Sequence, residues 1–498
     1  DGTTTDNSSV ISHQFQPELE SVDFTKRVSW DKFQPYNDKP LPLVPEGAPC
    51  IFNEDDSPAL CCQINAVSGR ARAITIHVQN QPGQETKIPR PIPTPIFMPV
   101  GTKGCLKGLE ISDLVDDPAL SCPIILANTY HLAIQPGTEL VDEMGGLHNF
   151  QGLPNASSKD KSYNLLTDSG GFQMVSLVKL SQITEDGVSF ENPFTRKDQG
   201  DVENDEDKEK DMLLLRPEDS IRHQNNISAN IIMALDDVVS SVEVNDERFR
   251  VATHRTLRWY DRCYKAHAKS DTQNLFPIVQ GGLDTELGGL REQCLAGFRH
   301  RAQEWKYKIP GYAIGGLAGG ESKDDFWRVV DQSCKALPDN KPRYLMGVGY
   351  PLDLVVCSAL GVDMYDCVYP TRTARFGVAL VPGAAPGTLR LKTRESSLNN
   401  DVIQKGCGCQ ACREGISRAR LHTLLKANNP LAVELVTQHN IAYMMALVRN
   451  MRKAIFEDTY GDFVKSFIKE QFPRNPGGGG DPCPQWVVDA LEAAGIQL

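Results

Sequence analysis

The chain has 498 residues, of which 40% are hydrophobic and 23% are charged, and its formal net charge is −12. This length and composition predict a globular protein with a large core and more than one module. The acidic balance argues against a free-standing, non-specific nucleic-acid binder, although a local basic patch would be enough to bind a specific RNA. No run of about 18 apolar residues occurs, so we expect no transmembrane segment.

The first part of the chain is polar and acidic, and it fits neither a signal peptide nor an acid-poor transit peptide. A dense run of acidic and basic residues at 195–211 predicts a solvated surface insertion. Four consecutive glycines at 477–480 predict a linker. The expected organisation is a flexible extension (1–58), a main catalytic domain (59–400), a metal-binding subdomain with closing helices (401–472), and a linker with a short C-terminal helix (473–498).

Eight short apolar runs precede helix-like sequence, and six of them end in a glycine or a polar residue. Strands that alternate with helices predict a parallel sheet, and eight such units favour an α/β fold of the (β/α)8 barrel type. A doubly wound open sheet is the alternative. The eight runs are Ile96–Val100, Ile124–Asn128, Asn164–Asp168, Ile231–Asp236, Phe276–Gln280, Tyr312–Gly316, Tyr344–Gly347 and Met364–Val368.

Catalytic groups of a barrel enzyme lie at the carboxyl ends of its strands. Asp366 is the one carboxylate in the segment 364–376, and Arg372 and Arg375 follow it, a pair suited to binding phosphate. An aspartate that caps a strand–loop junction beside solvated arginines would look the same. A second strand-end carboxylate, Asp168, is more telling, because two carboxylates can divide the roles of nucleophile and general acid/base.

Other strand ends carry groups suited to the edge of a purine. Asp236 can accept hydrogen bonds from ring N–H and amino groups, while Gln280 and the backbone at Gly316–Leu317 offer donors to a carbonyl. After Asp168, Gly170 and Gly171 permit close approach of a ligand and Phe172 can cover a planar ring. Taken singly, each polar group could be a strand-end cap and the two glycines a tight turn. The remaining strand ends, Asn128 and Met346, complete the same mouth of the predicted barrel.

Of fourteen cysteines, only Cys407, Cys409 and Cys412 cluster at the spacing of metal ligands. This indicates a reduced protein with one metal site rather than a secreted disulfide scaffold. Three thiolates with one imidazole form a closed tetrahedral site of the kind that holds structural zinc. His439 is the expected fourth ligand, although His422 also lies in range and His439 could be an ordinary helix histidine.

These residues together resemble the tRNA-guanine transglycosylase family over about residues 60–470. The motifs that carry the resemblance occur in the family's order along the chain and end with the metal ligands. They are Thr-Pro-Ile-Phe-Met-Pro-Val-Gly (94–101), Asn-Thr-Tyr-His-Leu (128–132), Thr-Asp-Ser-Gly-Gly-Phe-Gln (167–173), Val-Gln-Gly-Gly (279–282), Ala-Ile-Gly-Gly-Leu-Ala-Gly-Gly-Glu (313–321), Tyr-Leu-Met-Gly-Val-Gly (344–349) and Tyr-Asp-Cys-Val-Tyr-Pro-Thr-Arg (365–372).

The resemblance implies a barrel enzyme that exchanges a guanine of tRNA for a modified 7-deazaguanine. Asp366 would attack the ribose C1′, and Asp168 would act as general acid/base. The implied base-binding residues are Asp168, Ser169, Gly170, Gly171, Phe172, Asp236, Gln280, Gly316, Leu317, Gly319 and Met346. The implied contacts to a flipped-out anticodon nucleotide and its backbone are Gly347, Val348, Gly349, Tyr350, Pro351, Leu352, Asp353, Thr371, Arg372, Thr373, Ala374 and Arg375.

The pocket residues resemble the eukaryotic, queuine-inserting branch of the family. Bacterial members carry Val where this chain has Gly319, Cys where it has Val238, and Tyr where it has Phe172. Gly319 removes a side chain where the cyclopentenediol of queuine would sit. The expected substrates are then queuine, guanine and the anticodon stem-loop of tRNAs with GUN anticodons, those for aspartate, asparagine, histidine and tyrosine.

The resemblance also implies one structural zinc ion held by Cys407, Cys409, Cys412 and His439, and a heterodimer with a non-catalytic paralogue. It implies a cytoplasmic protein that associates peripherally with the mitochondrial outer membrane. The competing hypothesis is that this chain is itself the zinc-stabilised, non-catalytic tRNA-binding subunit. The presence of both Asp366 and Asp168 favours the enzyme. A two-carboxylate glycoside hydrolase would explain the acids but neither the arginines nor the purine-edge set.

Overall fold

The structure is a computed structural model that describes residues 42–81, 88–151, 161–171, 181–191, 212–241, 243, 246–383, 385–473 and 482–498. Four features expected from the sequence therefore fall wholly or mostly outside the described residues: the first 41 residues of the extension, Phe172, the acidic insertion 195–211, and the glycine-rich part of the linker.

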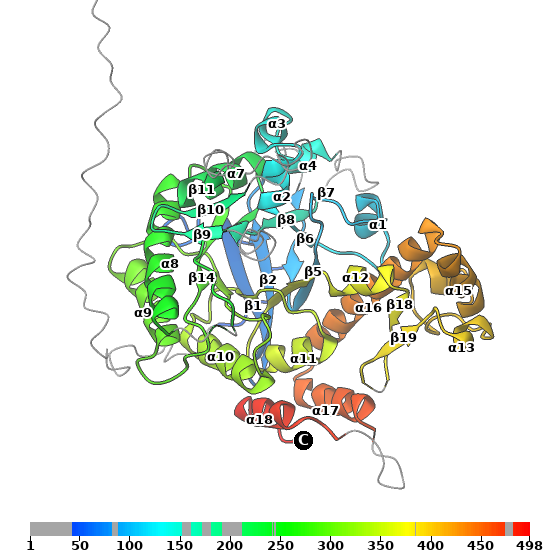
Figure 1. Cartoon of the computed structure of the whole chain (residues 1–498). Helices are drawn as coiled ribbons and strands as arrows, with labels where there is room; N and C mark the ends of the chain where they lie inside the picture. The colour runs from blue at the N-terminus through cyan, green and yellow to red at the C-terminus, as the bar shows by residue number, and fades with distance from the viewer. Residues whose placement is uncertain are drawn as a thin grey trace, which may run out of the picture.

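Eight parallel strand positions close into a barrel, which confirms the predicted fold (Figure 1). Neighbouring strands pair in parallel around the ring, and the circle closes through the pairing of β17 with β5 and a bridge between Val100 and Leu126. Pro277 interrupts the fifth position, so it appears as two short strands. The barrel strands are β5 (Ile96–Pro99), β6 (Ile124–Ala127), β8 (Asn164–Thr167), β12 (Ile231–Met233), β13 (Asn274–Phe276) with β14 (Ile278–Val279), β15 (Tyr312–Ile314), β16 (Arg343–Leu345) and β17 (Met364–Cys367).

Helices surround the strand ring (Figure 1). The strands are buried almost throughout because one face fills the barrel interior and the other packs under helices, which explains their continuous apolar sequence. The helices are α1 (Ile111–Asp116), α2 (Thr129–Ile134), α3 (Thr138–Glu143), α4 (Leu147–Phe150), α7 (Pro217–Ile227), α8 (Asp246–Ala266), α9 (Leu290–Gln303), α10 (Lys323–Ala336), α11 (Pro351–Ala359) and α12 (Tyr369–Arg375). Between β8 and α7, β9 (Ser181–Ile183), β10 (Val188–Glu191) and β11 (Met212–Leu215) form a small antiparallel sheet.

A hairpin, β1 (Leu60–Ser68) with β2 (Ala71–Val78), joins β4 (Ile92–Pro93) in a three-stranded sheet at the amino ends of the barrel strands. A fully buried ion pair between Arg72 of β2 and Asp363, just before β17, ties this sheet to the barrel. β3 (Ile88–Pro89), which falls between β2 and β4 in the chain, pairs in parallel with β7 (Lys161–Ser162) as a separate two-stranded sheet.

The folded part of the chain begins earlier than residue 59, where the sequence placed it. The Val44 N–H donates to Ile64 O at 2.7 Å, and the Asn65 amide donates to Val44 O at 2.9 Å. Glu46 forms an ion pair with Arg452 at 2.7 Å. Backbone bonding to the edge of β1 therefore orders residues 42–58 despite their low hydrophobicity.

The C-terminal part wraps one side of the barrel and appears in yellow to red in Figure 1. It contains β18 (Val378–Leu380), β19 (Thr388–Arg390), α13 (Arg394–Ser397), α14 (Gln410–Arg413), α15 (Arg418–Lys426), α16 (Pro430–Phe456), α17 (Tyr460–Gln471) and α18 (Gln485–Ala493). α16 packs against α12, β5 and the hairpin. By length and composition α16 could cross a membrane, but 78% of its most apolar window is buried inside the protein, as in a core helix.

Candidate active site

Asp366 lies on β17 at the carboxyl end of the barrel, almost completely buried. Its Oδ1 accepts hydrogen bonds from the Tyr344 hydroxyl at 2.6 Å and from the Gly347 N–H at 2.7 Å. Within the described residues Oδ2 accepts none, which leaves it for a substrate. Burial raises the pKa of Asp366, while the bonds from Gly347 and Tyr344 lower it. The arrangement is that of a carboxylate held in one orientation with one oxygen available to attack.

Asp168 follows β8 and is also buried. Its Oδ2 accepts from the Asn128 amide at 2.6 Å and its Oδ1 from the Thr129 N–H at 3.0 Å, both from the end of the neighbouring strand β6. The negative charges of Asp366 and Asp168 both contribute to raising the pKa of Tyr344, after burial as the main cause. The two predicted catalytic carboxylates thus lie at one mouth, both near enough to Tyr344 to affect the pKa of its phenol.

Asp236 and Gln280 lie side by side at two adjacent strand ends. The Gln280 amide donates to Asp236 Oδ2 at 2.7 Å, and the Ser169 hydroxyl approaches Oδ1 at 3.4 Å. Burial raises the pKa of Asp236 to about 6, against the opposing effect of the Gln280 bond. An ionised Asp236 accepts hydrogen bonds, so this pair can bind the N–H edge of a purine as the sequence predicts.

The backbone beyond β15 offers open donors next to this pair. Neither the Gly316 nor the Leu317 N–H donates to any residue in the described ranges. Gly316 has φ +73°, and a Cβ there would lie 2.5 Å from the Gln280 side-chain oxygen, so only glycine fits. Gly170 has φ +81° and lies against Tyr130, and a Cβ at Gly171 would come within 3.0 Å of Leu235. The site therefore has no room for a side chain at Gly316 and little at Gly171, while the φ of Gly170 favours glycine there.

Gly319 lies on the exposed loop after Leu317, beside a carboxylate-centred turn. The Glu321 carboxylate accepts from the Ala318 N–H at 2.7 Å, the Gly319 N–H at 2.9 Å and the Ser241 hydroxyl at 2.7 Å. A Cβ at position 319 would lie 2.4 Å from Ser241 Oγ. Ser241 and Glu321 thus hold this loop to the segment after β12. A side chain at position 319 would collide with the Ser241 hydroxyl unless that group moved.

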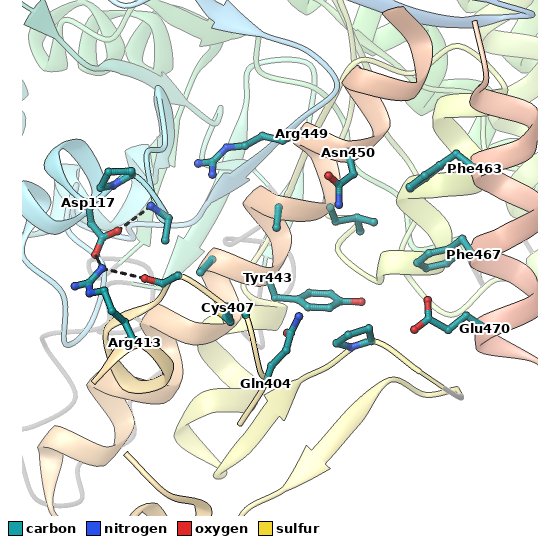
Figure 2. A pocket seen from close by; sticks show the side chains of 18 of the residues that line it. Asp117, Gln404, Cys407, Arg413, Tyr443, Arg449, Asn450, Phe463, Phe467 and Glu470 are labelled. Carbon is teal, nitrogen blue, oxygen red and sulfur yellow. Dashed lines mark hydrogen bonds and ion pairs between the residues drawn. The ribbon is translucent and has the colours of Figure 1, made fainter. Parts of the chain in front are cut away.

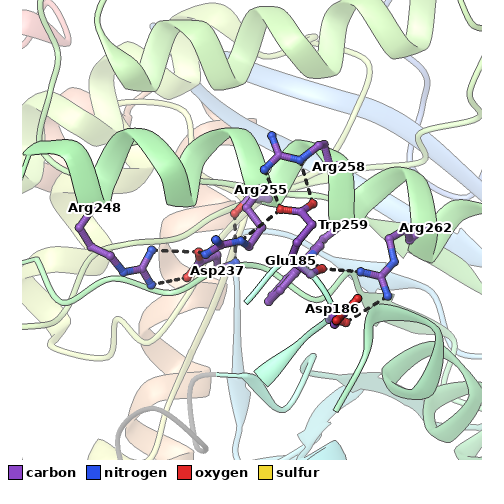
Figure 3. Close-up of polar contacts among 9 residues, drawn as sticks. Glu185, Asp186, Asp237, Arg248, Arg255, Arg258, Trp259 and Arg262 are labelled. Carbon is purple, nitrogen blue, oxygen red and sulfur yellow. Dashed lines mark hydrogen bonds and ion pairs between the residues drawn. The ribbon is translucent and has the colours of Figure 1, made fainter. Parts of the chain in front are cut away.

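Asp237, the neighbour of Asp236, is the centre of an arginine network (Figure 3). It is fully buried and accepts from Arg248 at 2.5 and 2.9 Å and from Arg255 at 2.6 Å, both on α8. Further along α8, Arg258 and Arg262 bind Glu185 and its backbone in the turn between β9 and β10. The network anchors the chain at residue 237 and so fixes the direction of the Asp236 side chain.

The predicted RNA-contacting segments lie at the N-terminus of α11 and along the C-terminal part of α12, whose last turn carries Arg372 and Arg375. Arg372 and Arg375 are exposed, as are Gly347 and Tyr350, whose ring lies 4.6 Å from that of Tyr369. Other members face inward: those buried are Val348, Gly349, Asp353 and Ala374, whereas those of intermediate exposure are Pro351, Leu352, Thr371 and Thr373. The exposed side chains of Tyr350, Arg372 and Arg375 are the members that can reach an RNA strand.

Met346 is partly exposed at the end of β16, one residue before the glycine that binds Asp366. Its N–H donates to Ile314 O at 3.3 Å. Met346 thus follows β16, the strand between β15 and β17. β15 leads to the open Gly316 amide and β17 carries Asp366, so a base bound by both would lie next to Met346. Phe172, its expected partner in the sandwich, is outside the described residues.

The three clustered cysteines and His439 converge on one point. His439 Nδ1 lies 3.6, 3.4 and 3.5 Å from the sulfurs of Cys407, Cys409 and Cys412. Zinc–sulfur and zinc–nitrogen bonds of ~2.3 and ~2.1 Å around a tetrahedral ion would separate nitrogen and sulfur by about 3.6 Å. His439 Nε2 contacts Leu380 O at 2.8 Å, which orients Nδ1 toward the sulfurs. The cluster fits a metal ion.

His422, the alternative ligand, is not in the cluster. Its Nδ1 contacts Leu391 O at 3.0 Å instead. The sequence spacing allowed either histidine, and the orientation of α16 selects His439.

A groove of about 640 Å³ lies between α16, α17 and the cysteine loop. Figure 2 shows Phe463 and Phe467 of α17 pointing toward Tyr443 of α16, with Cys407 and Arg449 at the opposite side. None of the predicted base-binding residues lines it, so this groove is separate from the site at the strand ends.

The sequence reasoning missed several groups that shape this site. Tyr344 lies at the start of a predicted strand, and nothing in its surroundings signalled a hydrogen bond to Asp366. Asp237 was overlooked beside its neighbour Asp236, and its arginines lie more than ten residues later on a surface helix. A buried double acid, Asp236-Asp237, followed by an arginine-rich helix was the available signal.

Comparisons with known proteins agree with this geometry. The model of the queuine tRNA-ribosyltransferase family matches residues 68–473. The queuine tRNA-ribosyltransferase catalytic subunit of Schizosaccharomyces pombe is 44% identical over 415 residues, which cover 82% of this chain and 92% of the relative. The catalytic subunit of Caenorhabditis elegans is 42% identical, with 82% and 94% covered. A queuine tRNA-ribosyltransferase of Thermus thermophilus is 39% identical, with 87% and 98% covered. The chain therefore belongs to the queuine tRNA-ribosyltransferase family.

Proposed function

We propose that this chain exchanges the guanine at the anticodon wobble position of GUN tRNAs for queuine. The observation that carries the proposal is the pair of buried, oriented carboxylates, Asp366 and Asp168, at one barrel mouth beside a purine-edge set. The names of its relatives describe the same activity. A non-catalytic accessory subunit would have no need of two such carboxylates.

In the first half-reaction, Asp366 Oδ2 attacks C1′ of the ribose, and the bond from C1′ to the guanine nitrogen breaks. The ribose becomes covalently attached to Asp366, and the departing guanine takes a proton from Asp168. Asp236, Gln280 and the open amides at Gly316 and Leu317 hold the base edge while it leaves. Tyr344 and Gly347 keep the attacking carboxylate in position.

In the second half-reaction, queuine occupies the vacated site. Asp168 removes a proton from the ring nitrogen of queuine, and that nitrogen attacks C1′ and displaces the Asp366 carboxylate. Both aspartates return to their starting states, so no other reactant is consumed. Arg372 and Arg375, both exposed, would hold anticodon phosphates throughout.

The decisive test compares wild type with Asp366→Asn, a change that keeps the size and removes the charge. Labelled queuine incorporation into tRNA and a denaturation-resistant RNA adduct should both disappear in the variant, with an unchanged thermal unfolding midpoint. Asp331→Asn on the outer side of α10 is the control and should retain activity. Full activity of Asp366→Asn would refute the proposed nucleophile.

The accessory-subunit alternative makes the opposite prediction. The purified chain would then bind tRNA but transfer no queuine, alone or with a paralogous subunit, and it would form no adduct. An adduct formed by this chain would exclude that role.

We propose that the metal in the cysteine cluster is zinc, one ion per chain, held by the Cys3His donor set described above. Because all four tetrahedral positions are protein ligands, the ion would have a structural role. Metal analysis of the purified chain should find about one zinc, and none after removal of a ligand.

The resemblance further supports a heterodimer with a non-catalytic paralogue, and a cytoplasmic location with peripheral association at the mitochondrial outer membrane. Co-expression followed by size-exclusion chromatography tests the heterodimer. Cell fractionation with a protease-protection step tests the location. Elution of this chain as an active monomer would contradict the heterodimer. Its absence from the cytosolic fraction and from the outer surface of mitochondria would contradict the proposed location.

A further inference from the structure

Arg291 is a completely buried arginine directly behind the base-edge residues. It lies in the first turn of α9, with no exposed surface. It makes no ion pair with a carboxylate in the described part of the chain, and its Nε has no hydrogen-bond partner there. Burial lowers the pKa of Arg291 to about 10, so the guanidinium stays charged at neutral pH.

The Arg291 guanidinium binds three backbone carbonyls from two strand ends. Nη1 donates to Val279 O at 2.9 Å and to Gly315 O at 3.0 Å, and Nη2 donates to Gly282 O at 2.5 Å. Nη2 would also lie 3.3 Å from a Cβ at Gly316. The charge thus bridges the loop that carries Gln280 and the loop that carries Gly316.

One of these bonds has a direct chemical consequence. The Gly315 carbonyl and the Gly316 N–H belong to the same peptide group. A cation bound to that carbonyl pulls electron density toward oxygen and makes the N–H a stronger donor, because bonds in a chain polarise one another. The Gly316 N–H is the open donor that points to a base carbonyl in the proposed function.

A purely structural role fits Arg291 poorly. Arg301, on the same helix and equally buried, forms bonds of 2.7 and 2.6 Å to Asp261, the usual compensation for a buried cation. Arg291 has carbonyl dipoles and a charge effect from Asp284, but no ion pair with a carboxylate in the described residues, so its buried charge is less fully compensated. Its full positive charge is instead available to the base-binding loops.

We propose that Arg291 is a positioning residue that fixes and polarises the Gly315–Gly316 peptide, so that the Gly316 N–H binds the carbonyl of guanine or queuine. This inference rests on the proposed base exchange. It adds that recognition of the 6-oxo group depends on a buried cation that does not touch the base.

The test measures how well the full chain discriminates guanine from 2-aminopurine, which lacks the 6-oxo group. Wild type is compared with Arg291→Lys and Arg291→Gln, and Arg301→Lys is the matched control. The measured quantities are KM for guanine, KM for tRNA and the inhibition constant of 2-aminopurine. The analogue also lacks the N1–H, but this loss is common to all four proteins. Neither KM nor the inhibition constant depends on the concentration of active enzyme, so a partly unfolded variant does not change the comparison.

For Arg291→Gln we expect a rise of about tenfold in KM for guanine and an unchanged KM for tRNA. The discrimination ratio, which is the inhibition constant of 2-aminopurine divided by KM for guanine, should fall by about the same factor. Arg291→Lys should lie between this variant and wild type. Arg301→Lys should lower the unfolding midpoint without changing the ratio. Equal effects of the two lysine variants on the ratio would overturn the inference, as would an unchanged ratio in Arg291→Gln. Failure of wild type to exchange any base would instead refute the proposed function.

Discussion

The hydroxyl of Tyr344 donates a 2.6 Å hydrogen bond to Asp366 from the neighbouring barrel strand. Both groups are buried, and the Gly347 N–H donates to the same oxygen at 2.7 Å. Burial raises the pKa of Asp366, and the two donors lower it. Both bonds therefore favour the ionised form of Asp366, which a nucleophile requires.

Tyr344→Phe should shift the acidic limb of the pH profile for base exchange upward. The Tyr344 bond lowers the pKa of Asp366, so its removal raises that pKa, and activity is lost at a higher pH as the medium is acidified. A hydrogen bond to a charged group contributes ~1.5–3 kcal/mol, or about one to two pH units. Tyr365→Phe is the control, because the Tyr365 hydroxyl contacts Ser358 and Leu354 instead. Identical profiles for wild type and Tyr344→Phe would contradict the role of this bond.

Base binding should weaken below pH 6. Burial raises the pKa of Asp236 to about 6, so the carboxylate that accepts the purine N–H groups becomes protonated as the pH falls through that value. KM for the free base should then rise about tenfold per pH unit, because binding requires the ionised form. Steady-state kinetics with saturating tRNA measure this. Asp236→Asn should show a high KM without that dependence, and a rise in KM that persists in Asp236→Asn would assign the titration to another group.

Gly319→Val should impair queuine use more than guanine exchange. A side chain at 319 would occupy the space expected for the cyclopentenediol, but its Cβ would also meet Ser241 Oγ at 2.4 Å. The double variant Ser241→Ala/Gly319→Val removes that hydroxyl and separates the two effects. Competition between labelled queuine and guanine gives the ratio. Equal losses for both bases in the double variant would refute the pocket argument.

Removal of a metal ligand should release the metal and destabilise the C-terminal part. Cys409→Ser replaces a fully buried cysteine of the cluster, and we expect loss of the proposed zinc ion and a lower unfolding midpoint. Zinc release from wild type by a chelator should be faster at lower pH, because protons compete for the thiolates. Cys483→Ser, outside the cluster, should retain the metal. Full zinc content in Cys409→Ser would show that the cluster is not the site.

The sequence by itself predicted the barrel fold and most of the residues of the candidate active site. Its eight apolar runs coincide with the eight strand positions, because strands buried on both faces need continuous apolar sequence. Since parallel strands end at one mouth, the positions of Asp168, Asp236, Gln280 and Asp366 followed from the register alone. The cysteine spacing likewise pointed to a metal cluster before any geometry was known.

Only the tertiary structure decided which groups act on these residues. Tyr344 reaches Asp366, and Arg291 reaches Gly315, across strand pairs and helix turns that no local pattern encodes. His439, the expected ligand, joins the cluster and His422 does not, because the direction of α16 brings His439 to the sulfurs. Local sequence specifies where a strand ends, since burial and turn formation are local. The orientation and charge of a buried group depend on neighbours distant in sequence, and these become known only when the barrel closes.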